Sequence, residues 1–191
     1  MADFYNPHTK LPYSNKNFLR ILDFYLFHCP VTTKSTIKKE AVYKKVSQRA
    51  ITFEEKGWVG GRLTALHNEM LKHIEHKDVN SAEEVASAWE ELERTSTNRD
   101  FYCDRVVYCN TIGKTKSLYY TIRNAFAHGS FEILNVKGKY IYFFETEKNG
   151  EMRSKIRLKE KTLLSWLTLF ERGYTPKEKK RSTKTKAGCA I

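Results

Sequence analysis

The sequence has no long apolar run and no secretory leader. Its most apolar stretch, Phe18 to Cys29, carries Arg20 and Asp23 and is shorter than the ~20 apolar residues that a membrane-crossing helix needs. We therefore expect a core helix there. The opening MADFYNPHTK has acidic and polar residues where a signal peptide has a basic region and an apolar stretch. These absences predict a cytoplasmic protein with no membrane association.

Metal-binding and nucleotide-binding patterns are also scarce. The cysteines show no C-x-x-C spacing, which favours unrelated reduced thiols over a zinc site or a disulfide framework: Cys29, Cys103, Cys109 and Cys189. His73 and His76 have the i, i+3 spacing of a ligand pair, but no carboxylate or cysteine set completes the group, so solvated histidines are favoured. Gly60-Gly61 is not followed by the Gly-Lys-Ser/Thr of a phosphate loop. We expect no metal and no cofactor.

Positive charge is abundant. The chain of 191 residues has a net charge of +12 and a pI near 9.5, which favours a polyanionic partner. Six basic residues against one acidic residue give the segment from 174 onward a charge of +5, and the preceding body carries the remaining +7. The tail has too few apolar residues to form a core, so we expect residues 174–191 to be disordered and to add sequence-independent affinity for phosphates.

The body is long enough for one core, and we expect a single domain over residues 1–173 after an irregular arm at 1–13. Apolar residues recur at three- and four-residue spacings in most of it. The predicted helices span Asn15 to Phe27, Ser35 to Glu55, Trp58 to Lys77, Ser81 to about residue 94, Asp100 to Asn110, Thr115 to Gly129, and Glu160 to Arg172.

The period changes after Gly129. β-branched and aromatic residues dominate residues 131–158, and turn pairs at Lys137-Gly138 and Asn149-Gly150 divide them into two or three short runs. We predict a small antiparallel appendage at about 130–158. The fold class is then mainly α, a helical bundle with a small antiparallel β appendage before the last helix.

The segment TKSLYYTIRNAFAHG combines a clear helical period with polar groups that are able to catalyse a reaction. At about 100° per residue its apolar positions fall on one arc, which predicts a buried face: Leu118, Tyr119, Ile122, Ala125 and Phe126. The opposite arc carries Lys116, Tyr120, Arg123, Asn124 and His128. Gly129 is expected to end the helix in a left-handed conformation, which places His128 in the last turn, where the helix dipole favours a positive charge.

The residues Arg123-Asn124-Ala-Phe-Ala-His128 resemble the R-x4-H motif of HEPN (higher eukaryotes and prokaryotes nucleotide-binding) domains, in which a polar residue usually follows the Arg. The resemblance covers most of Phe18 to Gly173. It implies a helical bundle and a metal-independent endoribonuclease that forms a homodimer with two motif helices face to face. By family analogy it implies a toxin or antiviral defence effector, with an antitoxin or defence partner.

The implied reaction is transesterification within RNA. His128 takes the proton from the ribose 2′-OH or gives one to the leaving 5′-oxygen, and Arg123 stabilises charge on the phosphate oxygens. Asn124 orients His128 or the phosphate. Lys116 and Tyr120 share this face and are candidates for holding the RNA backbone or stacking a base.

Other interpretations fit the same residues. Arg123 and His128 occur where surface polar residues often cap and solvate a helix. A non-catalytic RNA-binding or sensing subunit on the same fold is the main alternative, and a helical partner-binding protein with the motif in a dimer interface is a third. A second catalytic group among the carboxylates is also conceivable, although a solvated helix face is favoured for them: Glu83, Glu84, Glu90, Glu91, Glu93 and Asp104.

Overall fold

The computed structural model describes residues 12, 14–31, 50–98, 100 and 102–176. Most of the helix predicted over 35–55 lies outside these residues, as do nearly all of the N-terminal arm and residues 177–191 of the tail. The predicted end of that helix is wrong, because residues 53–57 form a turn.

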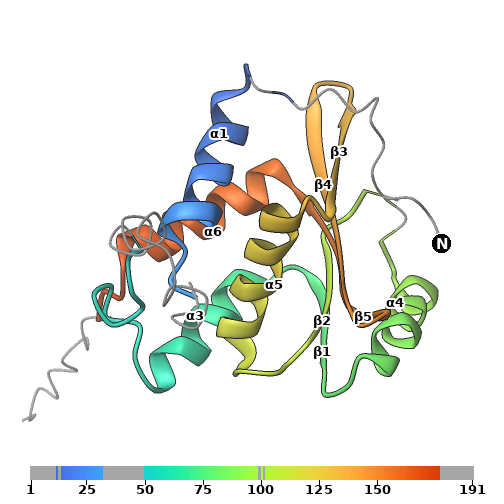
Figure 1. Cartoon of the computed structure of the whole chain (residues 1–191), viewed down its shortest axis with the longest axis horizontal. Helices are drawn as coiled ribbons and strands as arrows, with labels where there is room; N and C mark the ends of the chain where they lie inside the picture. Colours follow the sequence, from blue (N-terminus) through green and yellow to red (C-terminus); the bar gives the residue numbers. More distant parts are fainter. Residues whose placement is uncertain (1–11, 13, 32–49, 99, 101, 177–191) are drawn as a thin grey trace, which may run out of the picture.

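A mixed five-stranded sheet organises the described chain, so the expected helical bundle is wrong and the fold is α/β (Figure 1). The strands are β1 (Glu75–Val79), β2 (Arg105–Cys109), β3 (Phe131–Val136), β4 (Lys139–Lys148) and β5 (Glu151–Lys159). Their order is β1-β2-β5-β4-β3, in which β1 and β2 are parallel and the other neighbours are antiparallel. The predicted appendage is therefore part of the main sheet, with β5 paired on both sides.

Two strands account for the error in fold class. β1 was predicted as the end of a helix from Trp58, and β2 as a helix over Asp100 to Asn110. All five residues of β2 are buried, so its sequence lacks the alternation of a half-buried strand. A short apolar run of this kind cannot be distinguished from buried helix by its period. This segment is a strand because it pairs with residues distant in the sequence, such as Val106 with Ile156.

The predictions for the antiparallel strands are confirmed, including their turns. Lys137 and Gly138 have φ of 51° and 79°, and Asn149 and Gly150 have φ of 56° and 80°. Positive φ at two consecutive residues is the conformation of the tight hairpin turn that matches strand twist. The turns thus join β3 to β4 and β4 to β5, and the register between β4 and β5 shifts once, between Thr146 and Glu147.

The helices are α1 (Lys16–Asp23), a π-helical turn η1 (Phe24–His28), α3 (Gly61–Leu71), α4 (Glu83–Thr95), α5 (Lys114–His128) and α6 (Glu160–Arg172). Asn15 caps α1, because its side chain accepts hydrogen bonds from the backbone N–H groups of Asn17 and Phe18. Ser81 and Glu84 have the sequence spacing of a capping box, but the box is not formed: Ala82 is the N-cap, and Glu84 accepts from the backbone N–H of Asn80. The bounds of α6 agree with the prediction.

Helices cover both faces of the sheet (Figure 1). The main core lies between one face and α1, α3, α5 and α6, and it includes Val106 and Tyr108 of β2. A smaller core on the other face joins Val107 to Val85 and Trp89 of α4. Among the described residues, no helix has the length and apolarity needed to cross a membrane.

Candidate functional site

The motif lies on α5 as predicted. Gly129 ends the helix with φ of 69°, and its N–H donates to the carbonyl of Ala125. The predicted buried face is confirmed, since Leu118, Tyr119, Ile122, Ala125 and Phe126 are all 5% exposed or less. Ser117 of α5 is also buried. Its hydroxyl accepts from the backbone N–H groups of Thr111 and Ile112 and fixes the loop before the helix.

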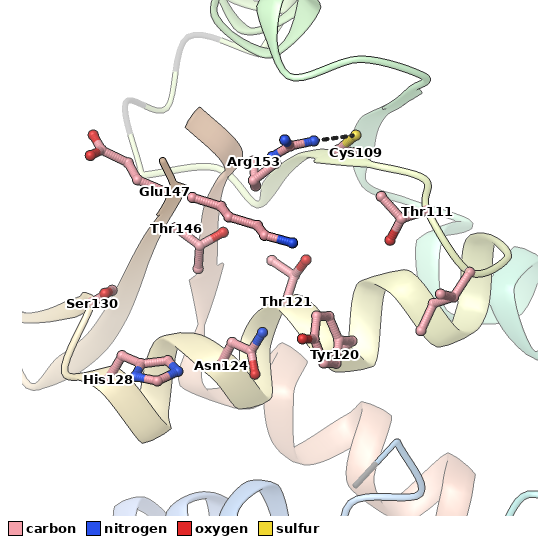
Figure 2. A pocket seen from close by; sticks show the side chains of 12 residues that line it. Cys109, Thr111, Tyr120, Thr121, Asn124, His128, Ser130, Thr146, Glu147 and Arg153 are labelled. Carbon is pink, nitrogen blue, oxygen red and sulfur yellow. Dashed lines mark hydrogen bonds between the residues drawn. The ribbon is translucent and has the colours of Figure 1, made fainter. Parts of the chain in front are cut away.

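A cleft of about 500 Å³ opens beside α5 and is called the His128 cleft here (Figure 2). Its helix side consists of Tyr120, Thr121, Asn124 and His128. Positions 120, 124 and 128 recur every four residues and therefore form one ridge along the helix. Two predicted catalytic residues and one predicted RNA-binding residue thus line the same cavity. His128 is exposed, so its imidazole is accessible to a ligand.

The opposite wall comes from the sheet and contributes cations. Thr146, Glu147 and Lys148 lie at the end of β4, and Arg153 lies near the start of β5. Arg153 is held by an ion pair to Glu151 at 2.8 Å. Its Nη1 also lies 3.9 Å from the Sγ of Cys109 (Figure 2). Its Nε is buried and has no hydrogen-bond partner among the described residues.

Arg123 is half-buried and is not among the residues that line the His128 cleft. Its Nη1 donates to Oδ1 of Asn124 at 3.2 Å, which connects it to the cleft through its neighbour. Burial raises the pKa of the Cys29 thiol to about 12, and a backbone hydrogen bond at Val31 and the positive charge of Arg123 oppose that rise. The Nε of Arg123 is buried without a partner in the described part of the chain.

Lys116 lines a different cleft, one helical turn before Tyr120. The carboxylates considered as alternatives lie away from the motif: none of those named above lines the His128 cleft. Asp104 accepts hydrogen bonds from Lys159 N and Thr162 Oγ1, both at 2.6 Å, and Glu93 pairs with Arg105 at 3.3 Å. These contacts support structural roles.

Lys148 and Arg153 were not identified from the sequence. The Asn149-Gly150 turn signalled that two strands would meet there, but nothing in the pattern placed that end of the hairpin opposite α5. Their position depends on the pairing of β4 with β5 and of β5 with β2, which joins residues about fifty positions apart.

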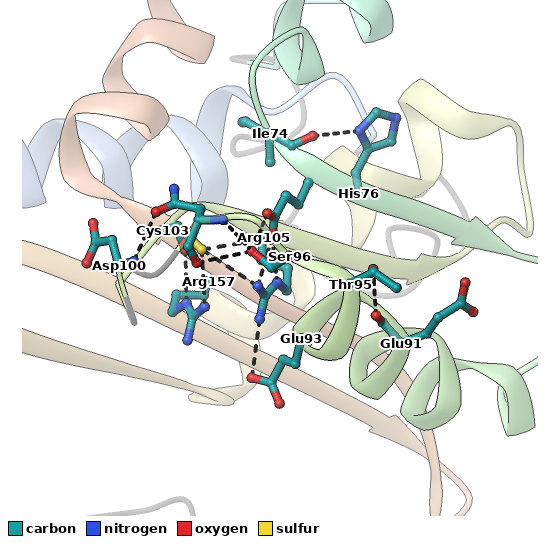
Figure 3. A network of polar contacts seen from close by, with 12 residues as sticks. Ile74, His76, Glu91, Glu93, Thr95, Ser96, Asp100, Cys103, Arg105 and Arg157 are labelled. Carbon is teal, nitrogen blue, oxygen red and sulfur yellow. Dashed lines mark hydrogen bonds and ion pairs between the residues drawn. The ribbon is translucent and has the colours of Figure 1, made fainter.

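A second polar cluster lies on the α4 side of the sheet (Figure 3). Arg105 donates from Nε and Nη2 to Oε2 of Glu75 at 3.0 and 2.7 Å. Arg157 donates from Nε to the carbonyl of Cys103 at 3.0 Å. The two guanidinium groups lie 5.3 and 5.5 Å from the ring centroid of Trp89. They are only 4% and 3% exposed, so this cluster offers no accessible site.

No family model, curated protein or solved structure matches this chain. The case for a function therefore depends on the geometry of the His128 cleft and on the resemblance of its motif.

Proposed function

We propose that the protein is a metal-independent endoribonuclease of the HEPN motif type that acts in the cytoplasm as a homodimer. The observation that carries this proposal is the His128 cleft, in which Asn124 and His128 face Lys148 and Arg153. The proposal takes the motif chemistry from the resemblance and not the helical-bundle fold. A toxin or antiviral defence role, with an antitoxin or defence partner, belongs to the same proposal by analogy.

In the proposed reaction an RNA phosphate lies between α5 and the ends of β4 and β5. Lys148 and Arg153 hold its oxygens, as cations commonly do in RNA-binding sites. His128 takes the proton of the 2′-OH as that oxygen attacks phosphorus, or gives a proton to the 5′-oxygen as the P–O5′ bond breaks, a contribution of roughly 10²–10⁴-fold in rate. Asn124 orients the imidazole or the phosphate, and Tyr120 provides a ring for base stacking. None of these roles requires a metal ion.

Arg123 has the role of stabilising charge on the phosphate, yet within one chain it is outside the His128 cleft. A two-fold partner would bring a second Arg123 and a second His128 to the same surface. The position of Arg123 outside the cleft of its own chain supports a composite dimeric site. The same position also fits the second candidate, a non-catalytic RNA-binding subunit, in which Arg123 has only a structural role through Asn124.

The test is cleavage of single-stranded RNA in EDTA by the wild type and by His128→Ala. We expect 2′,3′-cyclic phosphate products from the wild type and a loss of at least about 10²-fold in the variant. His73→Ala is the matched control, because His73 is also exposed but does not line the cleft. Activity that disappears in EDTA and returns with a divalent ion contradicts the mechanism, and binding without cleavage selects the second candidate.

The composite site is tested by mixing Arg123→Ala and His128→Ala proteins. A heterodimer carries one intact Arg and one intact His on opposite chains, so we expect cleavage to recover above that of either homodimer. Sedimentation velocity measures the assembly in parallel. A strict monomer that cleaves RNA at the full rate contradicts the shared site.

A further inference from the structure

A second cleft begins where the His128 cleft ends, and it is called the His67 cleft here. Its volume is about 580 Å³, and Ile112 lines both cavities. On α5, Tyr120 lines the first cleft and Lys116 lines the second, one turn nearer the N-terminus. An extended ligand that follows this side of α5 from His128 therefore passes Tyr120 and then reaches Lys116. Each cavity is within the roughly 300–1,000 Å³ typical of small-ligand sites.

The far wall of the His67 cleft is a polar face of α3. Thr64, His67 and Asn68 have i, i+3 and i+4 spacing, so they lie on the same side of the helix, and all three line the cleft. Thr64 and Asn68 are exposed, whereas His67 is buried at 4% exposure. This face therefore combines two accessible hydrogen-bonding groups with a buried imidazole between them.

Buried contacts fix the orientation of that face. The Nε2 of His67 lies 2.8 Å from the hydroxyl of Tyr108, a fully buried residue of β2. Burial lowers the pKa of His67. The contact between His67 and Tyr108 fixes α3, and with it the backbone of Asn68, against β2. The exposed Asn68 amide has donor and acceptor capacity and is suited to reading a base edge.

The other residues that line the His67 cleft include both lysines and an exposed apolar side chain. Lys114 is paired with Asp78 at 3.1 Å, whereas Lys116 forms no ion pair with any described residue. Ile112 is 50% exposed at the boundary between the clefts. An exposed apolar side chain at this position offers a contact for the face of a base, and Lys116 offers a charge for a phosphate.

We infer that the His67 cleft is a nucleoside subsite for single-stranded RNA, holding the nucleotide next to the phosphate in the His128 cleft. Asn68 and Thr64 hydrogen-bond its base, Lys116 binds a backbone phosphate, and Ile112 packs against the base at the boundary. This inference rests on the proposed function for the identity of its ligand. It adds that cleavage depends on the base at one neighbouring position.

Binding of 2′-O-methyl dinucleotides that carry a terminal phosphate at each end tests the subsite. The central phosphate occupies the His128 cleft and a terminal phosphate remains for Lys116, and the ligands stay intact because they lack the 2′-OH that the proposed reaction needs. The four bases are compared at one position and then at the other, by calorimetry with the wild-type protein. We expect one base at one position to bind about tenfold more tightly than the others, the scale of one good base contact. Asn68→Ala removes that preference, and Lys116→Ala weakens all the dinucleotides alike and flattens the salt dependence by about one charge.

Lys72→Ala is the control, because Lys72 is an exposed lysine of the same region that lines neither cleft. Binding without base preference, or equal losses in Asn68→Ala and Lys72→Ala, contradicts the subsite. The outcome is separable from that of the proposed function. Base-selective binding without cleavage of ordinary RNA leaves the subsite standing and removes the ribonuclease, whereas cleavage that is indifferent to Asn68 and Lys116 removes the subsite alone. An absence of all RNA binding contradicts both.

Discussion

Two pairs of arginines differ in how deeply they are buried and in what they contact. Arg105 and Arg157 lie under α4, and Arg123 and Arg153 lie at or next to the His128 cleft. Arg105 and Arg157 are almost completely buried, and their guanidinium groups contact a carboxylate and a backbone carbonyl (Figure 3). Both groups also lie near the ring of Trp89. Arg123 and Arg153 are only half-buried, and each keeps a buried Nε with no partner among the described residues.

The difference separates a structural role from a functional one. Burying a charge is costly unless hydrogen bonds and opposite charges satisfy it, so the partners of Arg105 stabilise the fold. Arg153 lines the His128 cleft and Arg123 is joined to it through Asn124, and both side chains are exposed enough to contact a ligand. The comparison predicts that the first pair affects stability and the second pair affects RNA binding and chemistry.

The largest effect is expected for Arg105→Ala. The change leaves Glu75 without its main partner and creates a cavity beside Trp89, so the free energy of unfolding should fall by about 3–5 kcal/mol. Urea denaturation measures it, with Arg94→Ala on the exposed side of α4 as the control. A loss below about 1 kcal/mol in Arg105→Ala means that the buried pair does not stabilise the fold.

Arg123→Ala should reverse this pattern. We expect RNA cleavage to slow by about 10²–10³-fold, the scale of one donor to a developing oxyanion, while the free energy of unfolding changes by less than about 1 kcal/mol. Single-turnover kinetics and urea denaturation are measured on the same preparation. A stability loss as large as that of Arg105→Ala assigns Arg123 to the structural class instead.

A smaller effect is expected for Arg153→Ala, which acts on binding. RNA affinity should fall about tenfold, similarly for all sequences, and the salt dependence of binding should flatten by about one charge. Lys72→Ala gives the background for loss of one exposed cation. An unchanged salt dependence in Arg153→Ala places this residue outside the path of the RNA.

The pH dependence of stability should be the smallest effect. Burial by itself raises the pKa of Glu75, but hydrogen bonds from Ser96 and Arg105 and the charges of Arg105 and Arg157 outweigh it and hold the pKa below its ordinary value. A carboxyl whose pKa is lower in the folded state stabilises the fold above its unfolded pKa, near 4.5, and this contribution disappears as the pH falls through the folded pKa.

Urea denaturation between neutral pH and pH 3 measures that contribution. The wild type should lose more stability below about pH 4.5 than Glu75→Gln, which has no charge to lose at this position. Parallel pH profiles for the two proteins would falsify the assignment. The result also checks the buried cluster without changing an arginine.

The candidate site was partly predictable because the residues on its helix side are close together in the sequence. The residues of α5 follow one helical period and end at a glycine, so the spacing of Asn124 and His128 is set by the helix alone. The residues that face them, Lys148 and Arg153, have no such period in common with the motif. Their approach depends on the register of three strands. Arg123 shows that even the residue next to Asn124 on the helix need not line the cleft.

The sequence by itself determined the helices α5 and α6, the tight turns at Lys137-Gly138 and Asn149-Gly150, and the cap at Asn15, because each depends on residues within a few positions of one another. Only the tertiary structure decided that Glu75–Val79 and Arg105–Cys109 are strands. Both are short, one is fully buried and the other is mostly polar, so neither has the alternation of a half-buried strand. Their backbone hydrogen bonds are satisfied by distant segments, and that pairing turned an expected helical bundle into an α/β fold.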